Sequence, residues 1–358
     1  MTNSLNQFAS ADAPRANGSA GDGGGARALA SPGLASEGAS SKDVYRAFCR
    51  EEASLPLFAR DWWLDAAVGP GGWDVALVKK LDQVIASMPY VLRSRYRLSI
   101  VTQPALTPVL GPWLRQQGGK TATQISHQID LMQQLIDQLP PFDYFAQTWH
   151  SSVKNWQPFF WNGFQQTTYY SYVMPDLTDT AALWANLESG VRRMIKKAGS
   201  EHRLQVRDDL PLDDFLALHR KTFERQGLRP PFSDAFVRRL DAACAERGCR
   251  KFFIAVDPQG VQHAGCYMVW DEHSAYGLMQ GSDPVLRTSG ANSLCLWTSV
   301  LYAAGVTRQY NFAGSMIAPI ERYIRDFGGN HVPYFHISKT PSRLLKMRQS
   351  VLSLIGKK

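Results

Sequence analysis

The order of the predicted secondary-structure elements repeats once along this chain of 358 residues. In each half, hydrophobic periodicity predicts helices, an antiparallel meander of strands, and then a helix, a strand, a helix and a final strand. The two halves share this order of elements and not their residue identities. The pattern therefore predicts an α+β protein of two tandem domains, each with a mixed, mostly antiparallel sheet flanked by helices.

The elements of both halves have the lengths usual in globular domains. In the first half we expect helices at 44–52, 58–68, 123–139 and 153–160, and strands at 73–79, 83–88, 96–102, 142–149 and 167–173. In the second half we expect helices at 176–199, 212–226, 234–247, 291–304 and 317–327, and strands at 204–206, 251–257, 263–270, 274–281, 308–312 and 332–338.

The ends of the chain differ in composition from the two predicted domains, 43–180 and 181–340. Residues 1–42 are rich in Gly, Ala and Ser, and such a segment cannot bury enough apolar surface to offset its ordering entropy, so we expect a disordered tail. In 341–358, Leu344, Met347, Val351 and Leu354 fall on one stripe among basic residues. This basic amphipathic helix either docks on its own domain or lies on an anionic membrane surface.

Composition favours a soluble, reduced, metal-free protein with anionic partners. No run approaches the ~20 apolar residues of a membrane-spanning helix, and the first residues lack the basic start of a secretory signal. Five cysteines form no C-x-x-C pair and eight histidines form no H-x-x-x-H, so we expect buried thiols in a cytoplasmic protein and no metal site. A net charge of +8 favours nucleic acid, a phosphorylated cofactor or an acidic membrane face.

Two stretches place polar residues beside glycines where a strand is expected to lead into a helix. The first is R-T-S-G-A-N, 287–292, where small residues at a helix N-terminus suit an anion, although Ser289 could simply cap the helix. The second is N-F-A-G-S-M-I-A-P-I-E-R-Y-I-R-D-F-G-G, 311–329. There Glu321 and Arg325 share a helix face, either as a surface ion pair worth about 0.3–0.5 kcal/mol or as functional groups.

These two stretches, with the basic helix R-R-M-I-K-K-A at 192–198, carry a family resemblance. The segment 277–297, G-L-M-Q-G-S-D-P-V-L-R-T-S-G-A-N-S-L-C-L-W, and the run F-G-G-N-H-V-P-Y-F belong to the same pattern. In this order they resemble GNAT-superfamily acyltransferases of the double-GNAT, Fem-like (methicillin-resistance factor) type. The resemblance covers roughly 43–340 and is clearest over 186–338.

The resemblance implies that the second domain holds an acyl-donor site in a cleft where a central strand parts from its neighbour. It implies acyl-CoA, with acetyl-CoA first, as co-substrate, and a helix N-terminus that holds the pyrophosphate. The cofactor-binding residues it implies are Met279, Gln280, Gly281, Arg287, Ser289, Gly290, Ala291 and Asn292. It implies that Glu321 or Tyr323 handles a proton and that Arg325 holds an anionic group. The implied substrate contacts are Ser315, Met316, Arg192 and Lys196.

The function implied is transfer of an acyl group from acyl-CoA to an amine, on an amino sugar or a cell-envelope precursor. One alternative is a non-catalytic double-GNAT scaffold that binds an anionic polymer or envelope partner. A second is a Fem-type peptidyl transferase that uses aminoacyl-tRNA, the one nucleic acid considered as a partner. Fem enzymes usually carry F-K-x-x-F-G, whereas this chain has Y-I-R-D-F-G with Ile324 at the Lys position, which counts against aminoacyl-tRNA.

Aromatic and histidine residues outside these stretches admit two interpretations. The clusters at 149–161 and 167–172 could stack on a sugar acceptor or pack the core and the domain interface. His219 lies within a helix and is expected to be structural, while Glu272 and His273 lie in a turn. No Ser-His-Asp arrangement follows from the spacing, and no G-x-S-x-G occurs.

Overall fold

The computed structural model describes residues 40–224, 227–343 and 345–347. The predicted tail 1–42 and the predicted C-terminal helix 341–358 lie mostly outside these residues. In the described chain no helix is both long and apolar enough to cross a membrane. Cys49, Cys244, Cys249, Cys266 and Cys295 are free and buried, as expected.

The first half runs from residue 40 to the end of β6. Its elements are α2 (Ser41–Glu51), η1 (Leu57–Ala59), α3 (Asp61–Val68), β1 (Asp74–Lys80), β2 (Gln83–Arg95), β3 (Leu98–Thr102), β4 (Trp113–Leu114), α4 (Thr121–Asp137), β5 (Tyr144–Thr148), α5 (Gln157–Trp161) and β6 (Gln165–Met174). Strand β2 is longer than predicted, and the short strand β4, which pairs with β2, was not predicted.

The second half runs from α6 to β12. Its elements are α6 (Thr180–Asn186), α7 (Ser189–Ser200), β7 (Gln205–Arg207), α8 (Leu212–Glu224), α9 (Asp234–Glu246), β8 (Arg250–Val256), β9 (Gln262–Trp270), β10 (Ser274–Ser282), η2 (Arg287–Ser289), α10 (Ala291–Ala303), β11 (Gln309–Asn311), α11 (Ala318–Arg325) and β12 (Asn330–Lys339).

The predicted single helix over 176–199 is wrong, because the chain breaks between α6 and α7. Leu187 and Glu188 are extended there, and Leu187 is buried. The Glu188 N–H donates to the Asp326 carbonyl at 2.9 Å, and the Asn186 amide donates to the Gly328 carbonyl at 2.7 Å. Contacts with the turn after α11 thus replace the helical hydrogen bonds that the sequence pattern indicated.

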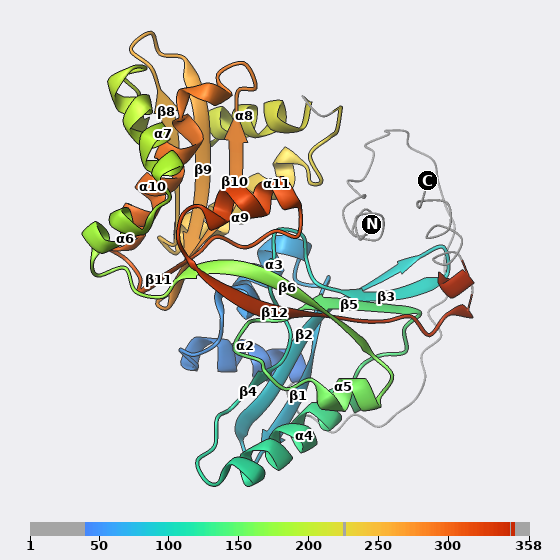
Figure 1. The fold of residues 1–358 in the computed structure, drawn as a ribbon. Coiled ribbons are helices and arrows are strands. Elements are labelled where there is room, and N and C mark those ends of the chain that lie inside the picture. Colours follow the sequence, from blue (N-terminus) through green and yellow to red (C-terminus); the bar gives the residue numbers. More distant parts are fainter. Residues whose placement is uncertain (1–39, 225–226, 344, 348–358) are drawn as a thin grey trace, which may run out of the picture.

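The two halves exchange their last strands. The described strands form one sheet in the order β1-β2-β3-β5-β12-β6-β11-β10-β9-β8-β7, with β4 on β2. Strand β12 of the second half pairs with β5 of the first, and β6 of the first half pairs with β11 of the second. Strands β6 and β12 also pair with each other over nine residue positions and cross between the halves (Figure 1). The predicted domain boundaries stay a prediction, since each half contains a strand from the other.

Alternating side chains of the second-half strands enter two different hydrophobic cores. On one face, Ala275 and Tyr310 pack with α7, α10 and α11. On the other face, Tyr276 packs with α8, α9 and the first-half segments η1 and α3. Arg239 of α9 ties these halves together, because its Nε donates to the Ala66 carbonyl at the end of α3 at 2.6 Å.

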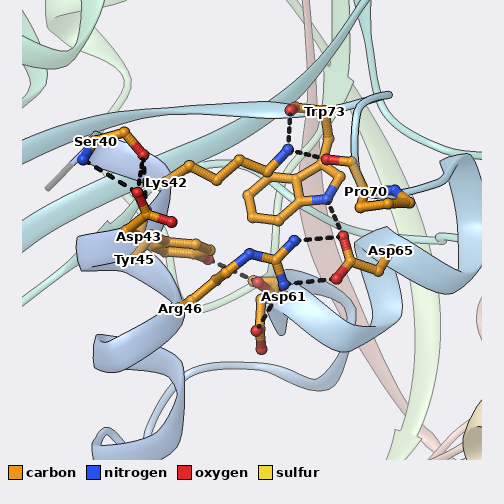
Figure 2. A network of polar contacts seen from close by, with 10 residues as sticks. Ser40, Lys42, Asp43, Tyr45, Arg46, Asp61, Asp65, Pro70 and Trp73 are labelled. Atoms are coloured by element: carbon orange, nitrogen blue, oxygen red, sulfur yellow. Dashed lines mark hydrogen bonds and ion pairs between the residues drawn. The ribbon is translucent and has the colours of Figure 1, made fainter.

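A polar network joins α2, α3 and the residue before β1 (Figure 2). The Arg46 guanidinium makes two bonds to the Asp65 carboxylate, at 2.6 and 2.8 Å, and the Trp73 indole donates to the same carboxylate at 2.8 Å. Burial opposes ionisation of Asp65, but the bonds from Arg46 and Trp73 outweigh it and keep its pKa below the ordinary value. This network therefore stabilises the corner that positions α3 against the second half.

Candidate functional site

Strands β10 and β11 form a fork. They pair in parallel only over Ser274–Tyr276 and Gln309–Asn311. Strand β10 then continues to Ser282 past an irregularity between Gly277 and Met279, while the chain after β11 turns away at Ala313 and Gly314, both with positive φ. Gly314 is required at this turn, because a Cβ there would lie 2.4 Å from the Tyr170 carbonyl oxygen. Beyond Tyr276, β10 has no described strand beside it on the β11 side.

A small cavity opens at the base of this fork, between the two halves. It encloses about 20 Å³, room for one water-sized group. The first half contributes Pro108, Val109, His150, Ser151 and Ser171, and the second half contributes Tyr276, Asn311, Ala313, Val332 and Tyr334. None of these lining residues carries a carboxylate or an ammonium group. The cavity therefore suits a neutral polar group of small size.

Hydrogen bonds orient two polar side chains of the cavity, those of Asn311 and His150. The Asn311 Oδ1 accepts from the Ser171 hydroxyl at 2.6 Å and from the Ala313 N–H at 2.9 Å. The His150 Nδ1 accepts from the Ser152 N–H at 3.2 Å, so its neutral ring carries the proton on Nε2. Burial lowers the pKa of His150 and favours this neutral form. None of these side chains was among the predicted site residues.

The N-terminus of α10 has unsatisfied backbone donors. Gly290 precedes the helix with φ of +83°, and no side chain caps the helix in full. The Ser289 hydroxyl accepts from the Ala291 N–H at 3.4 Å, a long bond, and the first bond made by the helix is from Leu294 to Gly290. In the described chain the N–H groups of Asn292 and Ser293 have no acceptor. Ser289 thus caps the helix in part, and the N–H groups of Asn292 and Ser293 stay available to an anion. Both the capping and the anion-binding interpretations of this stretch are therefore supported.

Tyr323 of α11 points its hydroxyl into the protein beside α10. Within the described chain this hydroxyl is buried and makes no hydrogen bond of normal geometry. Burial raises its pKa far above the ordinary value, and the nearby Ser293 hydroxyl offsets only part of that shift. The phenol therefore stays protonated at physiological pH, so it could act as a proton donor and not as a base.

Glu321 and Arg325 lie on the outer face of α11. The Arg325 guanidinium contacts the Glu321 carboxylate at 3.2 Å, and the Tyr172 hydroxyl of β6 donates to the same carboxylate at 2.6 Å. The Arg325 side chain is 52% exposed. The Glu321 carboxylate therefore already accepts from two protein donors.

The other predicted site residues are distributed around the fork. Met279 is buried, the Gln280 carbonyl accepts from His219 Nδ1 at 2.9 Å, and Gly281 lies against the backbone of α8. The Ser315 hydroxyl accepts from the Ile317 N–H at 3.1 Å, and Met316 is exposed.

The basic residues predicted as substrate contacts do not reach the cavity. Arg192 donates to the Ala185 carbonyl at 2.7 Å and to the Leu187 carbonyl, so it caps α6. Lys196 lies with Arg193 and Lys197 along a shallow basic depression on α7. Arg287 and Thr288, before α10, are exposed. None of these residues lines the cavity at the base of the fork.

The corresponding fork in the first half is closed. Strands β3 and β5 pair in parallel over only two positions, but Leu110 then continues the pairing by bonding to Thr148 and His150. The fully buried Trp149 fills the space, with its ring 2.4 Å from a Cβ built on Gly111. The aromatic cluster at 149–161 therefore packs the core here, at least through Trp149 and Phe159.

The fold is similar to that of known proteins. Residues 185–316 match the family described as Acetyltransferase (GNAT) domain. The structure is similar to the crystal structure of FemX, with a TM-score of 0.60 and 12% identity over 83% of this chain and 96% of that chain. It is also similar to the C-terminal DUF2156 domain of a proposed lysylphosphatidylglycerol synthetase from Agrobacterium fabrum, with a TM-score of 0.51 and 13% identity over 86% and 97% of the two chains. No curated protein sequence matches the chain.

These findings confirm the predicted α+β class and the predicted tandem GNAT arrangement. The matched GNAT segment contains β10, η2, α10 and β11, the elements that build the fork and the incompletely capped helix N-terminus.

Proposed function

We propose, from the premise that this chain has a GNAT-superfamily, Fem-like double-GNAT fold, that it transfers an acyl group from acyl-CoA to an amine. The observation that carries the proposal is that β10 and β11 pair over only three positions and then part, beside the N-terminus of α10, where two N–H groups have no acceptor in the described chain. The fork would hold the extended arm of the donor, and the free N–H groups of Asn292 and Ser293 would meet its pyrophosphate. The acceptor, an amino sugar or cell-envelope precursor by resemblance, would enter from the cavity side.

The reaction does not require covalent catalysis by the protein, because a thioester is already activated. The amine nitrogen attacks the carbonyl carbon, the carbon–nitrogen bond forms, and the carbon–sulfur bond breaks to release a thiolate. Tyr323 would protonate that thiolate, and the proton that the amine loses would return to the phenolate, so that one proton moves from nitrogen to sulfur overall. The protein mainly positions the two reactants and stabilises charge. Arg325, exposed on α11, remains a candidate for an anionic group of the acceptor.

Acetyl-CoA binding, measured by isothermal titration calorimetry, tests the proposal. The informative variant is Asn292→Asp, because a carboxylate in the first turn of α10 favours the helix but repels a pyrophosphate. We expect the unliganded variant to unfold at the same or a higher temperature, and to bind acetyl-CoA at least about tenfold more weakly, since like charges in contact cost a kcal/mol or more. Asn292→Ala is the matched control and should bind nearly as wild type does.

The alternatives give different results in the same experiment. If the wild-type chain binds no acyl-CoA but binds nucleic acid in a salt-sensitive way, the protein is the non-catalytic scaffold and not an acyltransferase. If it binds aminoacyl-tRNA and no acyl-CoA, the acyl donor is aminoacyl-tRNA, as in the Fem-type alternative. Equal affinity of the wild-type chain and Asn292→Asp for acetyl-CoA would remove the α10 N-terminus from the site.

A further inference from the structure

Asn311 occupies the point where β11 ends and the fork begins. Both hydrogen bonds that fix its side chain go to the same atom, Oδ1, which accepts from Ser171 and from the Ala313 N–H. A backbone N–H can only donate, so the oxygen and nitrogen of this amide are assigned by their partners. The Nδ2 group must therefore point away from Ser171 and Ala313.

The Nδ2 group of Asn311 has no acceptor in the described part of the chain, and Asn311 lines the cavity. An asparagine amide held at its oxygen by two donors has lost most of its freedom to rotate, so its two N–H bonds are presented in one direction. The cavity there is small, neutral and formed by both halves. A preorganised neutral donor in such a place fits an oxygen that gains negative charge during a reaction.

We propose that Asn311 Nδ2 binds the carbonyl oxygen of the acyl group to be transferred, and that Ser171 is the positioning residue that orients it. This inference rests on the proposed function. When the amine attacks, the electron pair of the C=O π bond moves onto that oxygen, and the Asn311 hydrogen bond strengthens. When the C–S bond breaks, the pair returns and re-forms the carbonyl. Asn311 neither gains nor loses a proton in either step.

The proposal gives the strand exchange a role in the reaction. Ser171 lies on β6 of the first half, and β6 reaches Asn311 only because it is inserted beside β11 of the second half. The reacting centre is therefore completed by a residue outside the segment that matches the GNAT family, 185–316. A second half without β6 would hold the Asn311 amide through Ala313 alone.

Titration of acetyl-CoA and of free CoA onto the same variants tests the proposal, because only acetyl-CoA has the carbonyl oxygen. Asn311→Asp keeps an oxygen for Ser171 and Ala313 but replaces the Nδ2 donor by an acceptor. We expect its affinity for acetyl-CoA to fall about tenfold, with CoA affinity changed less than about twofold. Asn311→Ala should show the same selectivity with a smaller loss, and Ser171→Ala should lose about two- to threefold for acetyl-CoA only.

Thr167→Ala, an exposed substitution on the same strand β6, is the control and should alter neither affinity. A loss of affinity for both ligands in equal proportion, or for neither, would overturn the role of Asn311 while leaving the proposed function intact. If the wild-type chain binds neither acetyl-CoA nor CoA, the proposed function fails and this inference fails with it. Thermal unfolding of each variant without ligand identifies any that has lost its fold.

Discussion

The hydroxyl of Tyr172 donates a 2.6 Å hydrogen bond to the carboxylate of Glu321, and this bond joins the two halves of the chain. Tyr172 lies on β6, and Glu321 lies on α11, the helix that also carries Tyr323. Ser171, next to Tyr172, faces the cavity on the opposite side of the strand. One exchanged strand thus holds both the helix of the expected proton donor and the amide of Asn311.

Glu321→Gln should leave turnover within about threefold of wild type, because glutamine keeps an oxygen that can accept from Tyr172. Tyr172→Phe should lower the free energy of unfolding by about 0.5–1.5 kcal/mol, the usual net value of one hydrogen bond. Urea unfolding and a thiol-release assay measure the two quantities. A hundredfold fall in the turnover of Glu321→Gln would instead make Glu321 the group that removes the amine proton.

Arg325→Ala should change stability by about 0.3–0.5 kcal/mol, since an exposed pair four residues apart on a helix contributes no more. If Arg325 holds an anionic acceptor group, the KM for that acceptor rises and the affinity for acetyl-CoA stays unchanged. Steady-state kinetics with the acceptor varied separates these effects. An unchanged KM would leave Arg325 a surface ion pair.

Tyr323→Phe should lower turnover by about 10²- to 10⁴-fold, because the thiolate leaves without a proton donor. Acetyl-CoA affinity should not change, and the free energy of unfolding should stay the same or rise, since the buried hydroxyl has no hydrogen-bond partner in the described chain. Tyr302→Phe, a partly buried tyrosine on α10, is the matched control. Comparable turnover in the two variants would exclude Tyr323 as the acid.

Gly290→Ala should destabilise the protein by about 1–3 kcal/mol or more, because a non-glycine residue is strained in the left-handed region. The added Cβ would also lie 2.1 Å from the Met194 carbonyl oxygen, a backbone atom. Gly199→Ala on the neighbouring helix α7 meets nothing within 4 Å and should stabilise by about 0.5–1 kcal/mol. Equilibrium urea unfolding compares the pair, and equal stability of the two variants would contradict the packing of α7 on α10.

Stability should fall as the pH is lowered below about 6.5, the ordinary pKa of histidine. Burial lowers the pKa values of His150, His219 and His336 in the folded protein. The unfolded chain therefore binds protons first, and the stability present above the unfolded pKa is lost as the pH falls through the folded values. Unfolding free energies at pH 7.5 and 5.5 should differ less in His336→Gln than in wild type, and an equal difference would exclude His336 as a contributor.

The element order could be predicted from the sequence because hydrophobic periodicity is a local property. The exchange of β6 and β12 between the halves could not be predicted. The alternation of apolar and polar residues along a strand shows which residues are buried, but it does not show which sheet edge the strand joins. The break between α6 and α7 depends on a hydrogen bond to the carbonyl of Asp326, which lies far along the chain. The residue type at Leu187 does not indicate this break. Contacts of this kind override local helical preference.

Part of the candidate site was also accessible to sequence reasoning. Gly290 and Tyr323 belong to contiguous stretches whose residue types indicate a helix N-terminus and a following helix. Asn311, Ser171 and His150 belong to three separate segments, and only the sheet order brings them together. The one local signal was the spacing of Asn311 before Gly314, which favours a turn closed by the asparagine side chain.

The exchanged strands also determine when during translation this protein can finish folding. Strand β5 pairs with β12, so the first-half sheet is incomplete until β12 has been synthesised. At about 5–20 residues per second, the ribosome takes roughly ten to thirty seconds to pass from the end of β6 to the end of β12. Throughout that interval the nascent first half presents an unpaired edge of the kind that invites mispairing with other chains. Chaperone dependence should therefore be greatest in chains stalled before residue 339 and should end once that residue has left the exit tunnel.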